Sequence, residues 1–199
     1  MSNSQLTSSF RDPSGFLFKK EDKVIRQVNQ IYKDNYDLLM NSGLYDSLIK
    51  KQWLIPHKET GDEGQEGFYK ILEPEQLRYI SYPYEWSFSQ LKDAALLTMD
   101  IQIEAMKHGM HLKDASAYNI QFHNGRPIFI DTLSFEKYQE GDPWVAYRQF
   151  CQHFLGPMAL IAYRDYRLLR LSQSFIDGVP LELASRLLPR RTWFRYCLL

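Results

Sequence analysis

The chain has 199 residues, 44% of them hydrophobic, which is enough for one domain or two small lobes around a real core. Its 24 basic and 24 acidic residues cancel, so charge gives no reason to expect nucleic-acid binding. The two cysteines, Cys151 and Cys197, lack metal-ligand spacing and indicate a reducing compartment without a disulfide framework. Since the start lacks a signal-peptide core and no apolar run reaches membrane-spanning length, we expect a soluble cytoplasmic protein that binds neither nucleic acid nor membrane.

The first part of the chain predicts a small β-rich region with a helical insertion. A loose polar start at residues 1–12 comes first, and Gly43 is expected to divide the helical insertion into two pieces. The predicted elements are, in order, a hairpin with a charged turn over residues 15–28, helix over 30–52, a loop over 57–67 and strands over 67–72 and 77–82.

The rest of the chain predicts mostly helix. Ser87 or Ser89 can cap a long helix that ends at His108, and its expected apolar face includes Ile103. Residues 193–199 are apolar except for Arg195, up to the final position, which indicates a chain cut from a longer parent, with a docked terminal helix as the alternative. Shorter helices are predicted over about residues 145–155, 158–171 and 180–188, with an interruption at 156–157.

The clearest chemical pattern is Asp114-x4-Asn119, two short strands, and then Asp131. Asn124-Gly125 between the strands is a strong hairpin signal, because both positions of the tight turn need positive φ. Antiparallel pairing would bring Asn119 and Asp131 within reach of one magnesium ion, which takes few protein ligands besides substrate phosphates. The structural alternative is that Asp114 and Asn119 only cap turns. Asp131 directly follows an apolar strand and therefore needs a partner or a metal.

This order of loop Asp, Asn, hairpin and Asp resembles the protein-kinase-like fold, most closely the branch of aminoglycoside and choline phosphotransferases. The resemblance implies an α+β fold with a small N-terminal β-rich lobe, residues 1–82, and a larger mainly helical lobe, residues 83–199. It also implies Mg²⁺ and ATP as cofactors and a small-molecule hydroxyl as the acceptor. By position it assigns a catalytic Asp114, metal ligands Asn119 and Asp131, a hinge residue Glu85 that would help to bind the cofactor, and a loop-steadying Asp142.

Some positions depart from this family's pattern. Leu112 stands two residues before the loop Asp, where the family usually has His or Tyr. Leu133 stands two residues after Asp131, where the family has Gly, and no glycine-rich phosphate loop appears near Gly15. These departures indicate that nucleotide binding is weak or lost.

The lysine that positions ATP in the family has two candidates here, Arg26 and Lys70. An arginine at such a site differs from lysine, because its planar fork has a different geometry. No Glu lies on the predicted helix over residues 30–50, although Asp34 and Asp37 could pair with Arg26.

A second resemblance is to the front half of bacterial proteins described as class I SAM-dependent methyltransferases, some of them called nodulation-specificity proteins. It implies that SAM binds to a C-terminal domain of the parent protein, outside this chain. None of the ten glycines forms the glycine-rich turn that a SAM site needs after a strand. The phrases that carry this resemblance are residues 81–86, 112–115, 118–122 and 126–131.

Three hypotheses therefore stay open: a small-molecule phosphotransferase, the front domain of a SAM-dependent methyltransferase, and a non-catalytic scaffold that keeps the fold. Other chemically capable residues have simpler interpretations. His111 and His123 are expected in a loop and a turn, and Trp144 and Trp193 in the core. The arginines of the C-terminal part are expected to form a solvated helix face: Arg186, Arg190, Arg191 and Arg195.

Overall fold

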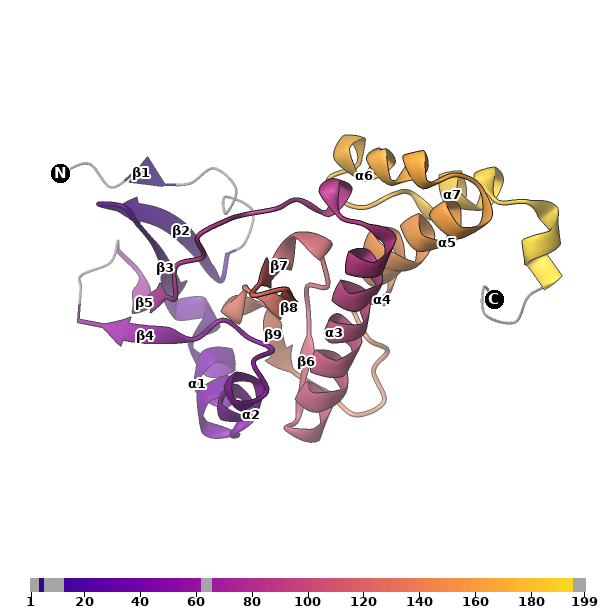
Figure 1. Cartoon of the computed structure of the whole chain (residues 1–199). Helices are drawn as coiled ribbons and strands as arrows, with labels where there is room; N and C mark the ends of the chain where they lie inside the picture. The colour runs from indigo at the N-terminus through magenta and orange to yellow at the C-terminus, as the bar shows by residue number, and fades with distance from the viewer. Residues whose placement is uncertain (1–3, 6–12, 62–65, 195–199) are drawn as a thin grey trace.

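The computed structural model describes residues 4–5, 13–61 and 66–194. Within these ranges an antiparallel sheet lies beside a larger, mainly helical part (Figure 1), which confirms the predicted α+β fold with a β-rich N-terminal lobe. The sheet has the strand order β1-β2-β3-β5-β4. Its strands are β1 (Ser4–Gln5), β2 (Gly15–Lys20), β3 (Lys23–Asn29), β4 (His57–Thr60) and β5 (Phe68–Pro74). The lobe boundary between residues 82 and 83 stays a prediction.

The predicted hairpin is formed by β2 and β3. Lys20 pairs with Lys23, so the turn consists only of Glu21 and Asp22, and Glu21 has a φ of 56°. The short strand β1 pairs with β2, where the sequence had indicated only a loose polar start. The remainder of that start, residues 6–12, lies outside the described residues.

The helical insertion divides at Gly43, as predicted, into α1 (Lys33–Asn41) and α2 (Leu44–Lys50). Gly43 has a φ of 81°, a conformation that glycine adopts without steric cost. The prediction of a continuous loop over residues 57–67 is wrong, because residues 57–60 form the strand β4. This strand lies at the sheet edge, where polar and charged residues are common, so its sequence lacks a strand's apolar alternation.

The strand predicted over residues 77–82 is also wrong. This segment links the two parts of the molecule as irregular chain (Figure 1). Its backbone bonds to a side chain, because Ser81 N donates to Gln121 Oε1 at 2.9 Å and Gln121 Nε2 donates to Ser81 O at 3.0 Å. Tyr79 and Ile80 are exposed, so the apolar residues that suggested a strand bury little surface.

The long helix is α3 (Phe88–Lys107), and Ser87 is its cap. Gln90 N donates to Ser87 Oγ at 3.2 Å, and Ser87 N donates to Gln90 Oε1 at 2.9 Å, which is a capping box. The helix buries most of the predicted apolar face, but Ile103 is 51% exposed and was wrongly placed there. In the described part of the chain no helix has both the length and the apolar character needed to cross a membrane.

Two small sheets follow α3. The predicted hairpin is β7 (Ile120–His123) with β8 (Arg126–Phe129), and its turn residues Asn124 and Gly125 have φ values of 51° and 76°. The other sheet, β6 (Met110–Leu112) with β9 (Phe135–Lys137), was not predicted. His111 therefore lies in a buried strand rather than in a loop, and its Nε2 lies 3.0 Å from Glu136 Oε1.

The first C-terminal helices run on without the predicted break at residues 156–157. A π-helical turn, Cys151–Leu155, joins α4 (Tyr147–Phe150) to α5 (Gly156–Tyr163), and Gly156 N donates to Cys151 O. Pro157 fits because it lies in the first turn of α5, where its missing N–H is not needed. The helices after α5 are a 3₁₀ turn over Tyr166–Arg170, α6 (Leu171–Ser174), α7 (Leu181–Leu187) and a 3₁₀ turn over Arg190–Phe194.

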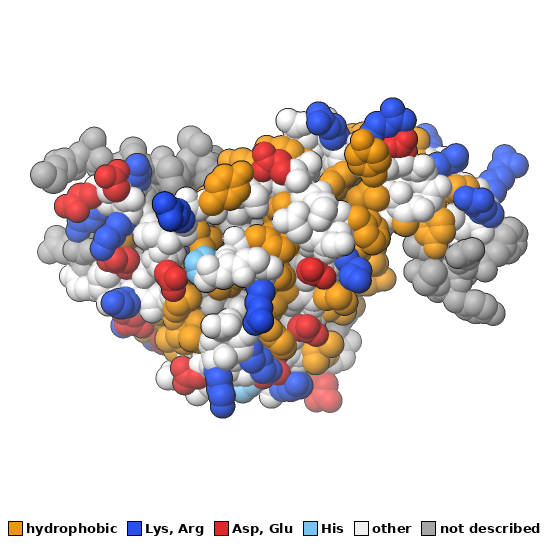
Figure 2. All heavy atoms as spheres, in the orientation of Figure 1, with side chains coloured by type: hydrophobic (Ala, Val, Ile, Leu, Met, Phe, Trp, Pro, Cys, Tyr) orange, Lys and Arg blue, Asp and Glu red, His pale blue; other side chains and the backbone are white. Residues whose placement is uncertain are grey.

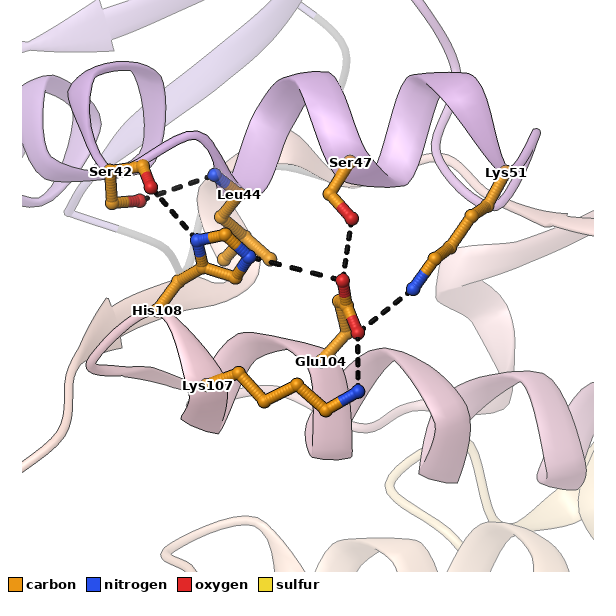
Figure 3. A network of polar contacts seen from close by, with 7 residues as sticks. All are labelled: Ser42, Leu44, Ser47, Lys51, Glu104, Lys107 and His108. Atoms are coloured by element: carbon orange, nitrogen blue, oxygen red, sulfur yellow. Dashed lines mark hydrogen bonds and ion pairs between the residues drawn. The ribbon is translucent and has the colours of Figure 1, made fainter.

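The two parts of the molecule share one hydrophobic core and a buried ionic contact. Leu44 and Leu48 of α2 belong to the same cluster as Ile101 of α3. Beside them the Glu104 carboxylate of α3 lies among donors from both helices (Figure 3). Its carboxylate oxygens accept hydrogen bonds or ion pairs from Ser47 Oγ at 2.5 Å, Lys51 Nζ at 2.8 Å and Lys107 Nζ at 2.9 Å. These donors, Lys51 and Ser47 first, lower the pKa of Glu104 to about 2, so it stays charged and fastens α2 to α3.

Candidate active site

Asn119 and Asp131 meet at the outer end of the β7–β8 hairpin, as predicted. Asp131 begins the turn after β8, and its Oδ2 accepts a hydrogen bond from Ser134 Oγ at 2.6 Å. Asn119 Nδ2 donates to the same Ser134 oxygen at 3.2 Å. Ser134 is fully buried and was not identified from the sequence, although a serine three residues after Asp131 is well spaced for such a turn. The two predicted metal ligands therefore share one buried hydroxyl.

Asp114 belongs to the same cluster. Burial raises the pKa of its carboxyl, and the negative charge of Asp131 raises it further. Hydrogen bonds oppose this shift, chiefly from the backbone of Ser116, whose N–H donates to Asp114 Oδ1 at 2.9 Å, and then from the amides of Gln149 and Asn119. The loop carboxylate thus lies within electrostatic reach of Asp131 and within hydrogen-bonding reach of Asn119.

Arg26 brings the N-terminal sheet into this cluster. Its Nη2 lies 2.6 Å from Asp131 Oδ1, and the two side chains are only 12% and 13% exposed. Arg26 lies on β3 two residues before Val28, so both side chains leave the same face of the sheet, toward Leu133. Of the two basic candidates, Arg26 is the one that contacts a predicted metal ligand.

Asp37, which the sequence offered as a partner of Arg26, makes other contacts. Asp37 accepts a hydrogen bond from Tyr69 Oη at 2.6 Å, which holds α1 against β5, and another from Lys33 Nζ at 2.9 Å within α1. Asp34, the second acid considered, lies in the first turn of α1. Asp131 is an observed acidic partner of Arg26, and the suggested pairing with Asp34 or Asp37 stays a prediction.

Lys70 and Glu85 lie outside the cluster. Lys70 Nζ pairs with Glu59 Oε2 on the neighbouring strand at 2.5 Å. Glu85 is exposed, and its Oε2 accepts a hydrogen bond from Tyr82 N at 2.8 Å, which closes the short turn between the linker and α3. Glu85 thus anchors the linker, and a cofactor-binding role for either residue stays a prediction.

The loop that carries Asp114 is held by Gln149 and Trp144 rather than by the expected Asp142. Gln149 Oε1 accepts a hydrogen bond from Ala115 N at 2.7 Å, and Trp144 Nε1 donates to Leu112 O at 2.7 Å. Asp142, expected in this role, is exposed. Gln149 was missed because one amide on a helix of four residues gives no signal in the sequence.

Leu133, which stands where the kinase-like pattern has a glycine, lies against Gly15. Leu133 is fully buried, and it packs against the start of β2. A Cβ at Gly15 would lie 2.7 Å from Leu133 Cδ1 and 2.0 Å from the carbonyl oxygen of Gln27, so no side chain fits there. The turn after Asp131 can therefore approach the sheet only because Gly15 is a glycine.

The described elements follow one order along the chain. Two helices lie between β3 and β4 of a five-stranded sheet, and a linker then leads into the long helix α3. A loop with Asp114 and Asn119 follows, and a hairpin ends at Asp131. This is the order of a protein-kinase-like fold.

Comparisons with known proteins give a relative by sequence and solved structures of similar shape. The chain is 33% identical over 196 residues to the nodulation protein NoeA of Rhizobium meliloti (strain 1021), which agrees with the nodulation-protein part of the second resemblance. The match covers 96% of this chain but 41% of that protein, so the chain spans about two fifths of its relative's length. No protein-family model matches the chain.

Two solved structures are similar in shape. Vaccinia related kinase 3 has a TM-score of 0.46 at 13% identity, over 92% of this chain and 78% of that one. WbdD has a TM-score of 0.44 at 12% identity, over 90% of this chain and 47% of that one. We draw no functional argument from either structure.

The donor set in the cluster suits magnesium only together with a phosphate ligand. Across the described ranges, no three or more His, Cys, Asp or Glu side chains gather as a metal site would require. The cluster offers two carboxylates, Asp114 and Asp131, and the amide of Asn119. Magnesium keeps several waters and is commonly bound by one or two carboxylates plus substrate phosphates, so these residues fit a metal that arrives with a nucleotide.

One hollow in the described structure lies away from this cluster. It has a volume of about 540 Å³ and lies between the end of α2 and the β7–β8 turn, next to His123 and Arg126. A smaller hollow of about 230 Å³ adjoins it beside α3. The exposed Arg186, Arg190 and Arg191 fit the expected solvated face, whereas Arg195 and the side chain of Trp193 lie outside the described residues.

Proposed function

We propose that this chain is a kinase-like phosphotransferase domain whose site is the cluster of Asp114, Asn119 and Asp131. The observation that carries the proposal is the convergence of these residues from two loops and a hairpin end, with Arg26 reaching Asp131 from the other lobe. A turn-capping role explains single Asp or Asn residues, but it does not explain a partly buried Asp114 carboxyl whose pKa is raised by burial and by the charge of Asp131. Such a perturbed carboxyl is typical of functional sites.

In this proposal each residue has a separate role. Asn119 and Asp131 would hold magnesium, which neutralises charge on the transferred phosphoryl group. Asp114 would accept the proton of a small-molecule hydroxyl as its oxygen attacks the γ-phosphorus and ADP leaves. Arg26 would leave Asp131 and donate to a phosphate oxygen, since a guanidinium binds phosphate through paired N–H groups. Alignment and charge neutralisation would supply the rate enhancement.

One observation favours a non-catalytic scaffold as the second candidate. The Arg26–Asp131 ion pair already neutralises the carboxylate that a metal needs, and a metal must compete with that contact. A scaffold would keep the pair permanently and bind no nucleotide.

The match to a longer protein favours a third candidate, in which this chain is the front domain of a SAM-dependent methyltransferase. Because the matched region is 41% of the relative, the methyl-transfer site and its SAM would lie outside these residues. This candidate is compatible with either of the other two for the chain itself.

Titration calorimetry with Mg²⁺–ATP and with SAM separates the candidates. The phosphotransferase proposal expects ATP to bind only with Mg²⁺, and expects Asp131→Asn to abolish that binding. The control is Asp165→Asn, which removes an aspartate whose Oδ2 also lies 2.6 Å from an arginine, Arg167, but on the surface. No heat with ATP would refute the proposal and favour the scaffold, and SAM binding by this chain would refute the placement of methyl transfer elsewhere.

A further inference from the structure

One face of α3 carries a row of apolar side chains that the fold leaves in solvent. Leu96, Ile103 and Met106 are 54%, 51% and 46% exposed, and Met99 between them is partly exposed. Figure 2 shows hydrophobic side chains among charged ones over the front of the molecule, where Figure 1 places α3. Single exposed apolar residues are normal, but an aligned row on one helix indicates a contact surface.

The spacing of the row is that of a helix pair. From Leu96 the intervals are three, four and three residues, which place Leu96 and Ile103 at a positions and Met99 and Met106 at d positions of a heptad. The opposite side of α3, including Ile101, is buried in the core, so the row points away from the molecule. The helix therefore presents a second packing seam that no element of the described structure covers.

We propose that this row is the contact between two copies of the chain, packed α3 against α3 in antiparallel direction. With a two-fold axis at the level of Ile101, Leu96 faces Met106 of the second copy, and Met99 faces Ile103 of the second copy. Each of the four side chains of the row then meets an apolar side chain of the second copy, as a self-complementary two-fold interface requires. This proposal does not depend on the phosphotransferase site.

The flanking charges select the antiparallel direction. Asp93 and Lys107 lie along the same edge of the row, near its opposite ends, so antiparallel packing places Asp93 beside Lys107 of the second copy, twice. In a parallel pair the acidic and basic residues of this edge would face uncharged residues. In the antiparallel pair Asp100 of one chain lies near Asp100 of the other, and this contact between like charges is the unfavourable one. Arg126 lines the same hollow as Asp93 and Asp100 and supplies positive charge there.

The size of the row implies a weak, reversible dimer. Four side chains from each copy form a contact at the small end of specific interfaces. The helix is already held in shape by the fold, so association does not have to order it. The protein should therefore be a monomer when dilute and a dimer when concentrated.

Sedimentation equilibrium over a wide concentration range tests the contact. We expect the mass to rise from 23.6 kDa toward twice that value, and Leu96→Glu or Ile103→Glu to weaken the dimer at least tenfold, because each places two charges in the seam. The control is Ile176→Glu, which changes another apolar residue, 65% exposed, on the loop after α6, and should leave dimerisation unchanged. A monomer at every concentration, or a dimer that both seam variants retain, would overturn the proposal.

Cysteine cross-linking tests the direction and does not depend on how much a seam charge disturbs folding. Under oxidation, a mixture of Met99→Cys and Ile103→Cys chains should form the mixed disulfide dimer in preference to either homodimer. Wild-type protein is the control for the native cysteines. Preferential cross-linking of Met99→Cys chains with themselves would indicate parallel packing and overturn the antiparallel arrangement.

Discussion

Arg26 Nη2 lies 2.6 Å from Asp131 Oδ1, and this contact joins the N-terminal sheet to the turn that follows the β7–β8 hairpin. Both side chains are nearly nine-tenths buried, so each charge helps to compensate the other where little water reaches them. The same contact links the fold's stability to the candidate site, because a metal at Asp131 would have to replace the guanidinium.

Breaking this pair from one side should be costly. Arg26→Ala or Asp131→Ala removes one member of a largely buried ion pair, and each should lower the free energy of unfolding by about 3–5 kcal/mol. The double variant should cost clearly less than the sum, as measured by urea unfolding in a double-mutant cycle. The same cycle on the exposed pair Asp165 and Arg167 should give a coupling below about 1 kcal/mol. Additive losses at Arg26 and Asp131 would show that the two side chains are not coupled.

Replacing Asp114 should stabilise the protein while it removes function. The pKa of Asp114 is raised by burial and by Asp131, so folding favours the protonated form, and the carboxylate costs stability at neutral pH. Asp114→Asn keeps an oxygen that can accept from Ser116 N, and it should raise the melting temperature at pH 7. The gain should disappear below about pH 3.8, where the carboxyl is protonated in both states.

The sign of this effect makes the test specific. Asp165→Asn should show no such gain, because hydrogen bonds from Arg167 lower the pKa of Asp165 to about 2. If Asp114→Asn lowers the melting temperature at pH 7, Asp114 serves as a structural turn residue and its assignment as a strained catalytic carboxylate is wrong. Phosphotransfer, if present, should fall by several orders of magnitude in the same variant.

The sequence predicted the site better than its surroundings. Asp114, Asn119 and Asp131 could be found because the Asn-Gly turn fixes a hairpin locally, and antiparallel pairing then decides which ends meet. The partner of Asp131 could be named only as one of two basic residues. Which of Arg26 and Lys70 reaches it depends on how the sheet packs against the hairpin, and spacing along the chain contains no information about that packing.

The errors in the predicted elements have one common cause. The edge strand β4 was missed and residues 77–82 were wrongly taken as a strand, because hydrophobic alternation reports burial and not hydrogen bonding. Ile103 shows the same limit in a helix: its apolar side chain suggested the core, yet it lies in solvent. Conversely, the sequence does not indicate that a polar residue such as Glu104 is buried, because its partners Ser47 and Lys51 come from another helical segment.

Glu104 should contribute strongly to stability above acidic pH. Its pKa is lowered to about 2, first by the hydrogen bonds from Lys51, Ser47 and Lys107, so the charged form is favoured by folding. Glu104→Gln keeps the shape but removes the charge, and it should lower the free energy of unfolding by about 2–4 kcal/mol at pH 7. This loss should be constant above about pH 5 and should shrink as pH falls toward 2, because wild-type Glu104 then becomes protonated. Asp46→Asn on the facing helix α2 serves as the control, and equal losses in both variants would contradict the role of Glu104.

Two histidines, His153 buried and His57 partly buried, should make the protein lose stability in mild acid. Burial lowers the pKa of His57 and of His153 to about 4, below the ordinary value of 6.5. Between these values the unfolded chain binds protons that the folded chain does not, so the free energy of unfolding falls as pH drops from 6.5 to 4, by up to about 3 kcal/mol for each residue. His57→Gln and His153→Gln should each flatten this decline in chemical denaturation at stepped pH. Wild-type and variant curves that run parallel from pH 7 to pH 4 would show that neither histidine is kept neutral by the fold.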